Sequence, residues 1–416
     1  MIKQIFYAIP AIMMITSSCN NNAQQTTDNH TKDTTTYQQG SFGYDLQFLQ
    51  QHDDSVAVLK AGDGKAQIIV SPKYQAKVFT STANGDEGLS FGWVNYKAFS
   101  TPTDAHMNAY GGENRFWLGP EGGKFSLYFK PGAKMEFANW KTPAPFDTEP
   151  WNVSNKTDNA ITLQKDMQLT NYKGTDLQVH VDRNIKILDH NQIAQNTGLT
   201  LDSSVKAVGY ETNNTITNKG NAAWTEATGM PCIWMLDMLK TTPATVIVVP
   251  YKNAAGQDFK NVATTDYFGQ IPADRLKHDD NKLFLKADGK SRGKLGIKPA
   301  FAKTALGSYD PQNKVLTITM FQPDPSAKYL NQEWNTTKPS FSGDAVNAYN
   351  DGPLADGSQM GPFYEIESVS PAAFLKPGAS LTHKHSVYHF TGNEQALDVI
   401  AQKLLGVSLN DIKQAF

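Results

Sequence analysis

Hydrophobic residues in this chain occur in short runs, rich in β-branched and aromatic side chains, that are separated by turn residues. Glycine-containing turns recur roughly every 8 to 12 residues, a spacing that predicts many antiparallel strands. Examples of the turns are AGDG at 61–64, ANGDEG at 83–88, PEGG at 120–123, KPGA at 130–133 and ADGK at 287–290. Examples of the runs are KAQIIVS at 65–71, AKVFTST at 76–82, KFSLYF at 124–129, LQVHVDRNIKIL at 177–188, TVIVVP at 245–250 and KVLTITMF at 314–321.

A helical pattern is clear only near the C-terminus. From Glu394 to Leu405 the apolar residues fall on one stripe, as in an amphipathic helix. Thr391 and Glu394 form a possible capping box at its start, and Gly406 is a C-terminal stop. With no internal repeat or proline-rich linker, we expect one all-β domain at 41–416, a large antiparallel β-sandwich closed by helices within 394–416.

The N-terminus reads as a secretion signal ending in cysteine. Lys3 provides the positive start, Phe6 to Ile15 the apolar stretch, and Thr16-Ser17-Ser18-Cys19 a small-residue cleavage site. The apolar stretch is too short for a spanning helix. It resembles a bacterial lipoprotein box, although Thr16 stands where leucine is commoner. We therefore expect a signal peptide at 1–19 and lipidation of Cys19.

The segment 20–40 is polar and almost free of aliphatic residues, which predicts a flexible tether. A lipidated chain of this kind would sit in the cell envelope, anchored to a bacterial membrane and most simply to the outer membrane. The lipid would be its only membrane contact.

Composition narrows the function classes. The chain is 39% hydrophobic and 11% aromatic, enough for a large core, and its net charge of −2 argues against nucleic acid as a partner. Cys232 is the other of two cysteines and lies in the apolar run PCIWML, which favours a buried structural thiol. No Ser-His-Asp order, phosphate loop, HExxH or CxxC motif supports the corresponding chemistry.

The stretch GPFYEIESVSPAAFLKPGASLTHKHSVYHF at 361–390 contains paired carboxylates and three histidines. Glu365 and Glu367 lie two residues apart, so on a strand they share one face. The histidines alternate in the same way on the following strand, at His383, His385 and His389. If the two strands pair, acids and imidazoles could line one concave sheet as candidate catalytic residues. The alternative is a solvated face with these side chains merely exposed.

A second candidate region is NAYGGENRFWLGPEGGKFSLYF at 108–129. Its glycines let the backbone approach a ligand, and Arg115 could form a forked pair of hydrogen bonds to a carboxylate or to sugar hydroxyls. Trp117 could stack on a pyranose ring, and Glu121 follows in the same segment. The alternative is a hairpin with a core tryptophan and a structural Arg–Glu pair.

Two further segments offer polar side chains. GDAVNAYNDGPLADG at 343–357 places Asn347, Asn350 and Asp351 in an expected loop, where they suit sugar hydroxyls or a hard cation such as Ca²⁺. Ordinary turn formation explains them equally well. DGKSRGKLGIKP at 288–299 gathers Lys290, Arg292 and Lys294, which would be counterions for an acidic sugar, or simply a solvated basic hairpin.

Two of these regions resemble the galactose mutarotase (aldose 1-epimerase) family. Glu365-Ile366-Glu367, Pro371 and Leu375-Lys376-Pro377-Gly378 stand where the family has an acid-x-Gln strand, a proline segment and L-x-P-G-E. Glu367 replaces the usual glutamine. The Gly-Gly segment with Arg115, followed by Trp117-Leu118-Gly119-Pro120-Glu121, is similar to the early strands of such proteins, which hold an arginine near the sugar.

The resemblance, which extends to secreted bacterial lipoproteins of that fold, implies a β-supersandwich and a mono-, oligo- or polysaccharide ligand. The stretch around Tyr210 to Trp224 lacks the family's NH-x-YFN-L motif, which supplies the general-acid histidine. His383, His385 or His106 would have to replace it. The resemblance leaves open an epimerase-type enzyme, a non-catalytic glycan-binding lipoprotein, and a polysaccharide lyase or glycoside hydrolase. No cofactor is expected, and a structural Ca²⁺ stays an open alternative.

Overall fold

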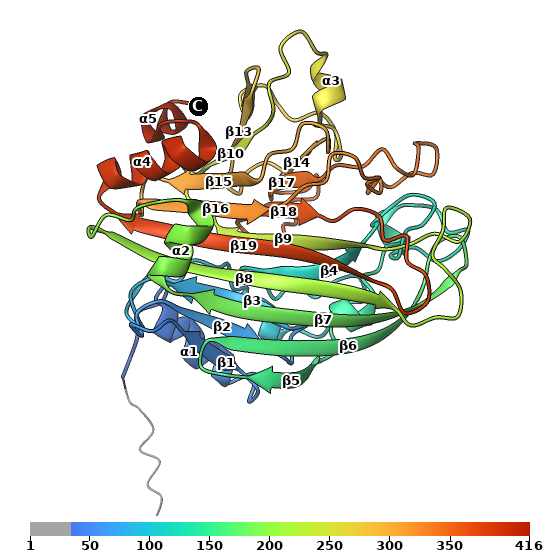
Figure 1. The fold of residues 1–416 in the computed structure, drawn as a ribbon, viewed down its shortest axis with the longest axis horizontal. Helices are drawn as coiled ribbons and strands as arrows, with labels where there is room; N and C mark the ends of the chain where they lie inside the picture. The colour runs from blue at the N-terminus through green and yellow to red at the C-terminus, as the bar shows by residue number, and fades with distance from the viewer. Residues whose placement is uncertain (1–34) are drawn as a thin grey trace, which may run out of the picture. The chain divides into compact units, whose positions relative to one another are not determined.

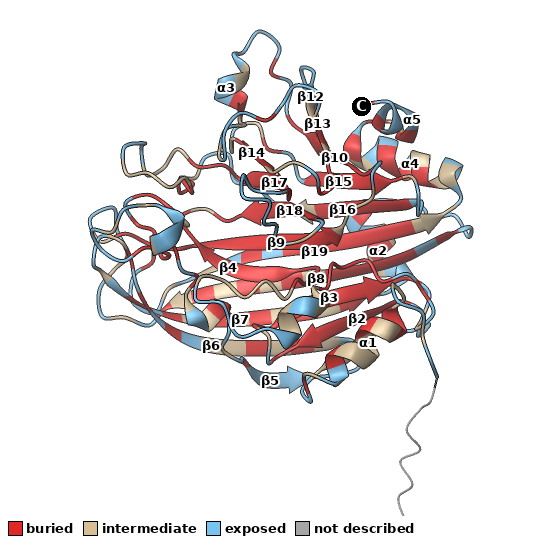
Figure 2. Cartoon of the chain, turned by 180° about the vertical axis from the view of Figure 1, so that it is seen from behind, coloured by how far each residue is buried: buried red, intermediate tan, exposed pale blue. Residues whose placement is uncertain are grey.

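Long antiparallel strands form the centre of the molecule (Figure 1). The computed structural model describes residues 35–416, so the predicted signal peptide, Cys19 and residues 20–34 of the predicted tether lie outside the described residues. Tyr37–Phe416 forms one compact unit with three sheets of ten, six and three strands. Exposed residues gather in its loops and helices, whereas the central strands are buried (Figure 2). The predicted antiparallel all-β fold is therefore confirmed.

The ten-stranded sheet forms one layer. Its longest strands neighbour each other in the order β19, β8, β7 and β6. In spatial order the strands are β12 (Leu276–His278), β13 (Lys282–Lys286), β10 (Val246–Pro250), β15 (Ala305–Asp310), β16 (Val315–Phe321), β19 (Ser380–Gly392), β8 (Val205–Asn218), β7 (Asp176–Leu188), β6 (Ala160–Thr170) and β5 (Asn152–Lys156).

The six-stranded and three-stranded sheets face it. In spatial order the first contains β11 (Ala263–Thr264), β14 (Gly293–Ile297), β17 (Val346–Asn350), β18 (Phe363–Val369), β9 (Cys232–Lys240) and β4 (Arg115–Gly119). The second contains β1 (Ala57–Lys60), β2 (Gln67–Ser71) and β3 (Lys77–Thr82). A bridge between Val78 and Asn114 links the two sheets next to β4. Apolar side chains from both layers fill the space between them.

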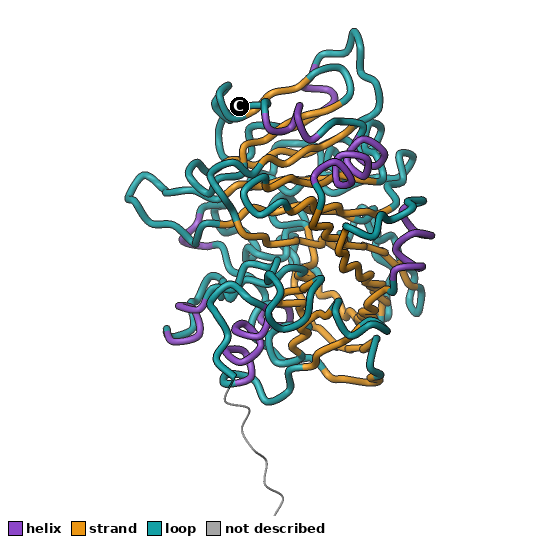
Figure 3. The backbone as a smooth tube through the Cα atoms, turned by 90° about the vertical axis from the view of Figure 1, so that its left-hand side faces the viewer, coloured by secondary structure: helices purple, strands orange, loops and turns teal. Residues whose placement is uncertain are grey.

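Helices lie around the strands (Figure 3). The predicted C-terminal helix is α4 (Glu394–Leu405), which Gly406 ends in the left-handed conformation at φ +69°. Its N-cap is Asn393 rather than Thr391, because the Asn393 side chain accepts hydrogen bonds from the first-turn amides. The remaining helices are α1 (Phe42–Gln50), α2 (His190–Thr197), α3 (Phe259–Val262), α5 (Leu409–Lys413), and the 3₁₀ turns η1 (Tyr96–Ser100), η2 (Phe137–Asn139) and η3 (Ala144–Phe146).

The helices α2, α4 and α5 cover the outer face of the ten-stranded sheet with apolar side chains. Ile193, Leu397 and Ile412 belong to the same buried cluster as Tyr388 and Phe390 of β19. No helix in residues 35–416 is long and apolar enough to cross a membrane.

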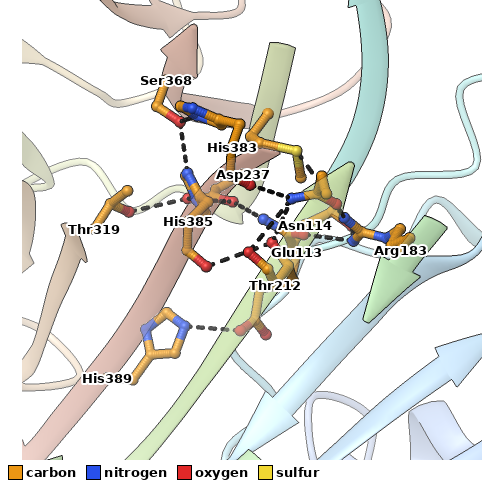
Figure 4. A network of polar contacts seen from close by, with 12 residues as sticks. Glu113, Asn114, Arg183, Thr212, Asp237, Thr319, Ser368, His383, His385 and His389 are labelled. Carbon is orange, nitrogen blue, oxygen red and sulfur yellow. Dashed lines mark hydrogen bonds and ion pairs between the residues drawn. The ribbon is translucent and has the colours of Figure 1, made fainter. Parts of the chain in front are cut away.

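A buried polar network joins the two main sheets (Figure 4). Asp237 on β9 accepts hydrogen bonds from Asn114 Nδ2 at 2.7 Å and Thr319 Oγ1 at 2.9 Å, and its Oδ2 lies 2.8 Å from His385 Nε2. Arg183 on β7 donates to Asn114 Oδ1 at 2.6 Å. Because polar groups buried without partners are costly, this network favours one relative position of the two sheets.

The strands that hold Glu365 and the histidines do not pair, so the condition for acids and imidazoles to share one sheet is not met. β18 pairs with β17 and β9, whereas β19 pairs with β16 and β8 in the other sheet. The segment at 370–379 crosses from one layer to the other instead of closing a hairpin at its Pro-Gly turn. His383 and His385 therefore point into the core, where His383 Nε2 and His385 Nδ1 each lie 2.7 Å from Ser368 Oγ.

Two other local predictions also fail. The run at 124–129 forms no strand, although its apolar side chains are buried in the core: they pack from an irregular segment and not from a paired strand. The segment at 343–357 is not a loop throughout. β17 begins at Val346, and Val346 and Ala348 alternate with polar residues and pack in the core.

Replacing Asp237 with alanine should lower the free energy of unfolding by about 2–5 kcal/mol, because His385, Asn114 and Thr319 lose a shared buried partner. Urea denaturation followed by tryptophan fluorescence measures this loss. The exposed Asp54→Ala variant is the control and should stay within about 0.5 kcal/mol of wild type. Equal stability of the two variants would show that the network contributes nothing to the fold.

Candidate functional site

A cavity of about 570 Å³ lies over the face of the six-stranded sheet that points away from the ten-stranded sheet. Strand register accounts for its floor, since alternate residues of β4, β9, β18 and β17 share this face. Loop residues form the walls, among them His106, Trp140, Trp334 and Leu354. Residues from distant parts of the chain are thus brought to one site.

Arg115 and Glu365 meet in this cavity. They form an ion pair between β4 and β18, and their side chains are only 5% and 8% exposed. Burial raises the pKa of Glu365 to about 7, although the Arg115 guanidinium opposes that rise and the neighbouring Glu367 carboxylate adds to it. Arg115 Nε is buried with no hydrogen-bond partner among residues 35–416. The pair therefore combines a carboxyl of raised pKa with a guanidinium whose Nε has no hydrogen-bond partner within residues 35–416.

Trp117 also lines the cavity, but most of its surface is packed. Its ring is 5% exposed, lies edge-on to Trp234 at 5.6 Å, and has the Arg115 guanidinium 5.0 Å from its centre. This packing fixes the Arg115 side chain beneath the cavity and leaves only a small part of the indole for a ligand. Trp117 is thus as much a scaffold as a contact surface.

Glu367 shares the cavity face of β18 but lies below the cavity floor and does not line it. Its Oε2 accepts hydrogen bonds from Trp234 Nε1 at 2.7 Å and Lys294 Nζ at 3.1 Å, and its side chain is fully buried. The ammonium of Lys294 also lies 4.4 Å from the centre of the Trp234 ring. The predicted acid pair is thereby divided into one carboxyl in the cavity and one in a buried structural pair.

The predicted polar ligand residues are also divided. Glu121 and Asp351 line the cavity, and burial raises the pKa of both carboxyls. Tyr349 donates to Asp351 Oδ1 at 2.6 Å.

Asn347 and Asn350 do not line the cavity. Asn350 points to the opposite face of the sheet from Glu365. Its Oδ1 accepts a hydrogen bond from Gly289 N and its Nδ2 donates one to Ser291 O, both at 2.9 Å, and these bonds hold the turn at 289–291. Asn347 is on the cavity face, but its amide donates to Tyr267 Oη and Leu295 O, each at 3.2 Å. Both asparagines therefore hold the strands and turns around the site.

The histidines predicted as catalytic residues, His383 and His385, contact Ser368 and Asp237 in the buried polar network (Figure 4). Ser368 and Asp237 have the opposite strand parity to Glu365, so both histidines lie on the other side of the six-stranded sheet from the cavity. Burial lowers the pKa of His383 to about 3, so its imidazole is neutral. His106, in contrast, lines the cavity wall, with Nδ1 2.5 Å from Trp140 O. Donation from Nδ1 to this carbonyl leaves the Nε2 lone pair free.

Several cavity residues were not expected from the sequence, chiefly aromatic side chains on separate loops and strands. Nothing in their local patterns distinguishes them from core residues. They are Phe137, Trp140, Trp234, Tyr267, Phe268, Trp334 and Tyr349. Of the predicted basic cluster, Arg292 and Lys294 line the cavity and Lys290 does not, and the Arg292 guanidinium lies 3.7 Å from the centre of the Phe268 ring. Residues 35–416 contain no group of three or more His, Cys, Asp or Glu side chains arranged to hold a metal ion.

Solved structures with a similar fold cover about four-fifths of the chain. A putative aldose 1-epimerase from Escherichia coli K12 is 13% identical, with a TM-score of 0.50, and covers 80% of this chain and 98% of its own. The Slr1438 protein from Synechocystis sp. PCC 6803 is 12% identical, with a TM-score of 0.50, and covers 81% of this chain and 96% of its own. A galactose mutarotase-like protein from Lactobacillus casei ATCC 334 is 12% identical, with a TM-score of 0.47, and covers 80% of this chain and 99% of its own.

The first two likenesses establish the galactose mutarotase-like fold that the sequence resemblance implied, and at such low identity they establish the fold alone. No curated protein matches the chain. A family model described as "Family of unknown function (DUF6786)" matches residues 40–416. The chain belongs to this family.

Proposed function

We propose that the protein binds a carbohydrate in the cavity and that Glu365 acts as an acid/base group in epimerase-type chemistry on that sugar. The observation that carries this proposal is the convergence of Arg115 and Glu365 in a buried, aromatic-walled cavity. Pockets of about 300–1,000 Å³ lined by apolar side chains with a few polar groups are typical ligand sites. The cavity volume of about 570 Å³ falls within this range.

The pKa of Glu365, raised to about 7, suits a group that both accepts and returns a proton. In anomer exchange, the carboxylate removes the proton of the C1 hydroxyl while an acid protonates the ring oxygen, and the bond between C1 and the ring oxygen breaks. Rotation and reclosure, with the protons returned, give the other anomer. Arg115 would hold the carboxylate and a sugar hydroxyl together, since its guanidinium offers several donors.

His106 is the best candidate for the second proton-transfer group, because it lines the cavity that contains Glu365. Its ring is oriented by the hydrogen bond from Nδ1 to Trp140 O and stacks on Phe137 with 4.6 Å between ring centres. In its protonated form, Nε2 would donate to the ring oxygen. Glu367 takes no part in this mechanism, because its carboxylate lies below the cavity floor and accepts hydrogen bonds from Lys294 and Trp234.

A non-catalytic glycan-binding function is the second candidate. The abundance of aromatic side chains in the cavity favours it, since rings stack on sugar faces without any proton transfer. In that case Glu365 serves only to orient Arg115 and to accept hydrogen bonds. Polysaccharide lyase and glycoside hydrolase activities are the remaining alternatives, and each gives a different product in the experiment below.

Glu365→Gln should abolish turnover while leaving sugar affinity within about tenfold of wild type, because the amide preserves shape and removes the ionisable proton. Polarimetry of freshly dissolved anomers measures epimerisation, and reducing-sugar and unsaturated-uronate assays detect hydrolysis and lysis. For the wild-type protein, kcat/KM should fall as the pH is lowered below about 7, because the carboxylate form of Glu365 that removes the proton is then lost.

Glu226→Gln is the matched control, since Glu226 is 54% exposed and pairs with Lys328 outside the cavity. Undiminished turnover by Glu365→Gln would reject Glu365 as the acid/base group. Binding without turnover of any sugar tested would favour the glycan-binding function instead.

We also propose, from the sequence alone, that Cys19 is lipidated and places the protein in the bacterial cell envelope. Cys19→Ser should move the protein from the membrane fraction to the soluble fraction and leave its melting temperature unchanged, because the compact unit begins at Tyr37. Fractionation and thermal denaturation measure the two properties. A wild-type protein found in the soluble fraction, or an unfolded variant, would contradict the proposal.

A further inference from the structure

Exposed apolar side chains concentrate at the mouth of the cavity. Large hydrophobic residues that are exposed number eight in residues 35–416: Leu89, Phe137, Val153, Phe268, Leu354, Met360, Phe374 and Val399. Four of the eight line the cavity, namely Phe137, Phe268, Leu354 and Met360, with exposures of 62%, 38%, 46% and 39%. They come from three separate segments, so chain proximity does not explain the clustering. Grouped exposed apolar side chains of this kind mark a contact surface.

Aromatic rings connect this mouth to the interior. His106, Phe137, Trp140 and Trp334 all line the cavity, and successive ring planes in this order are tilted by only 22°, 19° and 23°. The ring centres are 4.6, 6.1 and 5.9 Å apart. The rings therefore form a continuous aromatic wall that runs from exposed Phe137 to Trp140, which is 6% exposed. We call these four residues the aromatic wall.

The polar groups suit hydroxyl-rich ligands rather than purely apolar ones. Trp140 Nε1 and Arg115 Nε are buried and have no hydrogen-bond partner within residues 35–416, although both side chains line the cavity. Buried indole N–H groups usually have a partner. The Arg292 guanidinium adds further donors at the same cavity, where it lies over Phe268. A lipid tail or an apolar peptide side chain would leave the Arg292 donors without an acceptor, whereas sugar hydroxyls accept from them.

We propose that the natural ligand is an oligosaccharide or a longer glycan rather than a free monosaccharide. Its terminal sugar occupies the floor at Arg115 and Glu365, and the following units lie against exposed Phe137 of the aromatic wall and Phe268 at the mouth. Because Glu365 is buried and Phe137 is 62% exposed, the site has a closed end for a chain terminus and an open end for the rest of the chain. This inference rests on the proposed function, since it specifies the class of carbohydrate at that site.

Isothermal titration calorimetry with sugars of increasing length tests it. The probes are mono- to hexasaccharides of α-1,4-glucan, β-1,4-glucan, β-1,4-xylan, β-1,4-mannan and α-1,4-galacturonan. In at least one series, affinity should rise by about tenfold or more from the monosaccharide to the tetrasaccharide and then level off. Phe137→Ala should remove most of this gain and lower the affinity for the monosaccharide much less than the affinity for the tetrasaccharide.

Phe374→Ala is the matched control, because Phe374 is 43% exposed and lies outside the cavity lining. It should retain the full gain with chain length. Thermal denaturation should show both variants folded, since neither ring belongs to the buried core.

The possible failures are distinguishable. If monosaccharide and tetrasaccharide of every binding series have equal affinity, or if Phe137→Ala keeps the gain, the chain-length inference is wrong while carbohydrate binding stands. If no sugar in the five series binds, the proposed function fails and this inference fails with it.

Discussion

The alternation of side chains across the six-stranded sheet is the constraint on which the site depends. Asp237 and Ser368 point inward and bind His385 of the ten-stranded sheet. Their neighbours in sequence, Met238 and Glu367, point outward. At the start of β4, Asn114 likewise points inward to Asp237, and Arg115 points outward to Glu365. A polar network that fixes the two layers thus also fixes the strands that form the cavity floor, because each strand supplies residues to both faces.

The buried charges impose the second constraint. Two acids and two bases are removed from water on one sheet face, and each acid has its own cation, Arg115 for Glu365 and Lys294 for Glu367. Isolated charges in such a place would be very unfavourable, so the pairs must form together with the strands. The two acids differ in access. Glu367 is covered by its partners, whereas Glu365 remains at the cavity and its pKa is raised to about 7. Burial and pairing together therefore separate a structural carboxylate from a chemically available one.

Local patterns in the sequence were sufficient for much of the fold. Turn spacing and β-rich runs predicted an antiparallel all-β architecture, and the apolar stripe with Gly406 predicted α4. The two-residue spacing of Glu365 and Glu367 correctly placed this pair on one strand face. Arg115 and Trp117, which are also two residues apart, share a face of β4 in the same way. These features depend on backbone periodicity, which a single sequence reveals.

The failures concern the way distant segments meet. The segment after Ser370 crosses between layers, so residues that alternate correctly on β19 face the core instead of the cavity, and the predicted roles of His383 and His385 lose their geometric basis. The aromatic wall is assembled from loops that are far apart in the chain, and each ring separately has the pattern of a core residue. His106 entered the sequence analysis only as a substitute, yet it is the histidine that lines the cavity. Which side chains line the cavity is therefore decided by how distant segments pack together, and a single sequence does not reveal that packing.

A crystal structure of the Glu365→Gln variant with a bound tetrasaccharide tests the central claim most directly, that the outward face of the six-stranded sheet is the carbohydrate site. The account predicts a terminal sugar within hydrogen-bond distance, about 3 Å, of the side chains at positions 115 and 365, with the next sugars against Phe137. Sugar bound only elsewhere on the molecule, with the cavity over β4, β9 and β18 left without sugar, would contradict it.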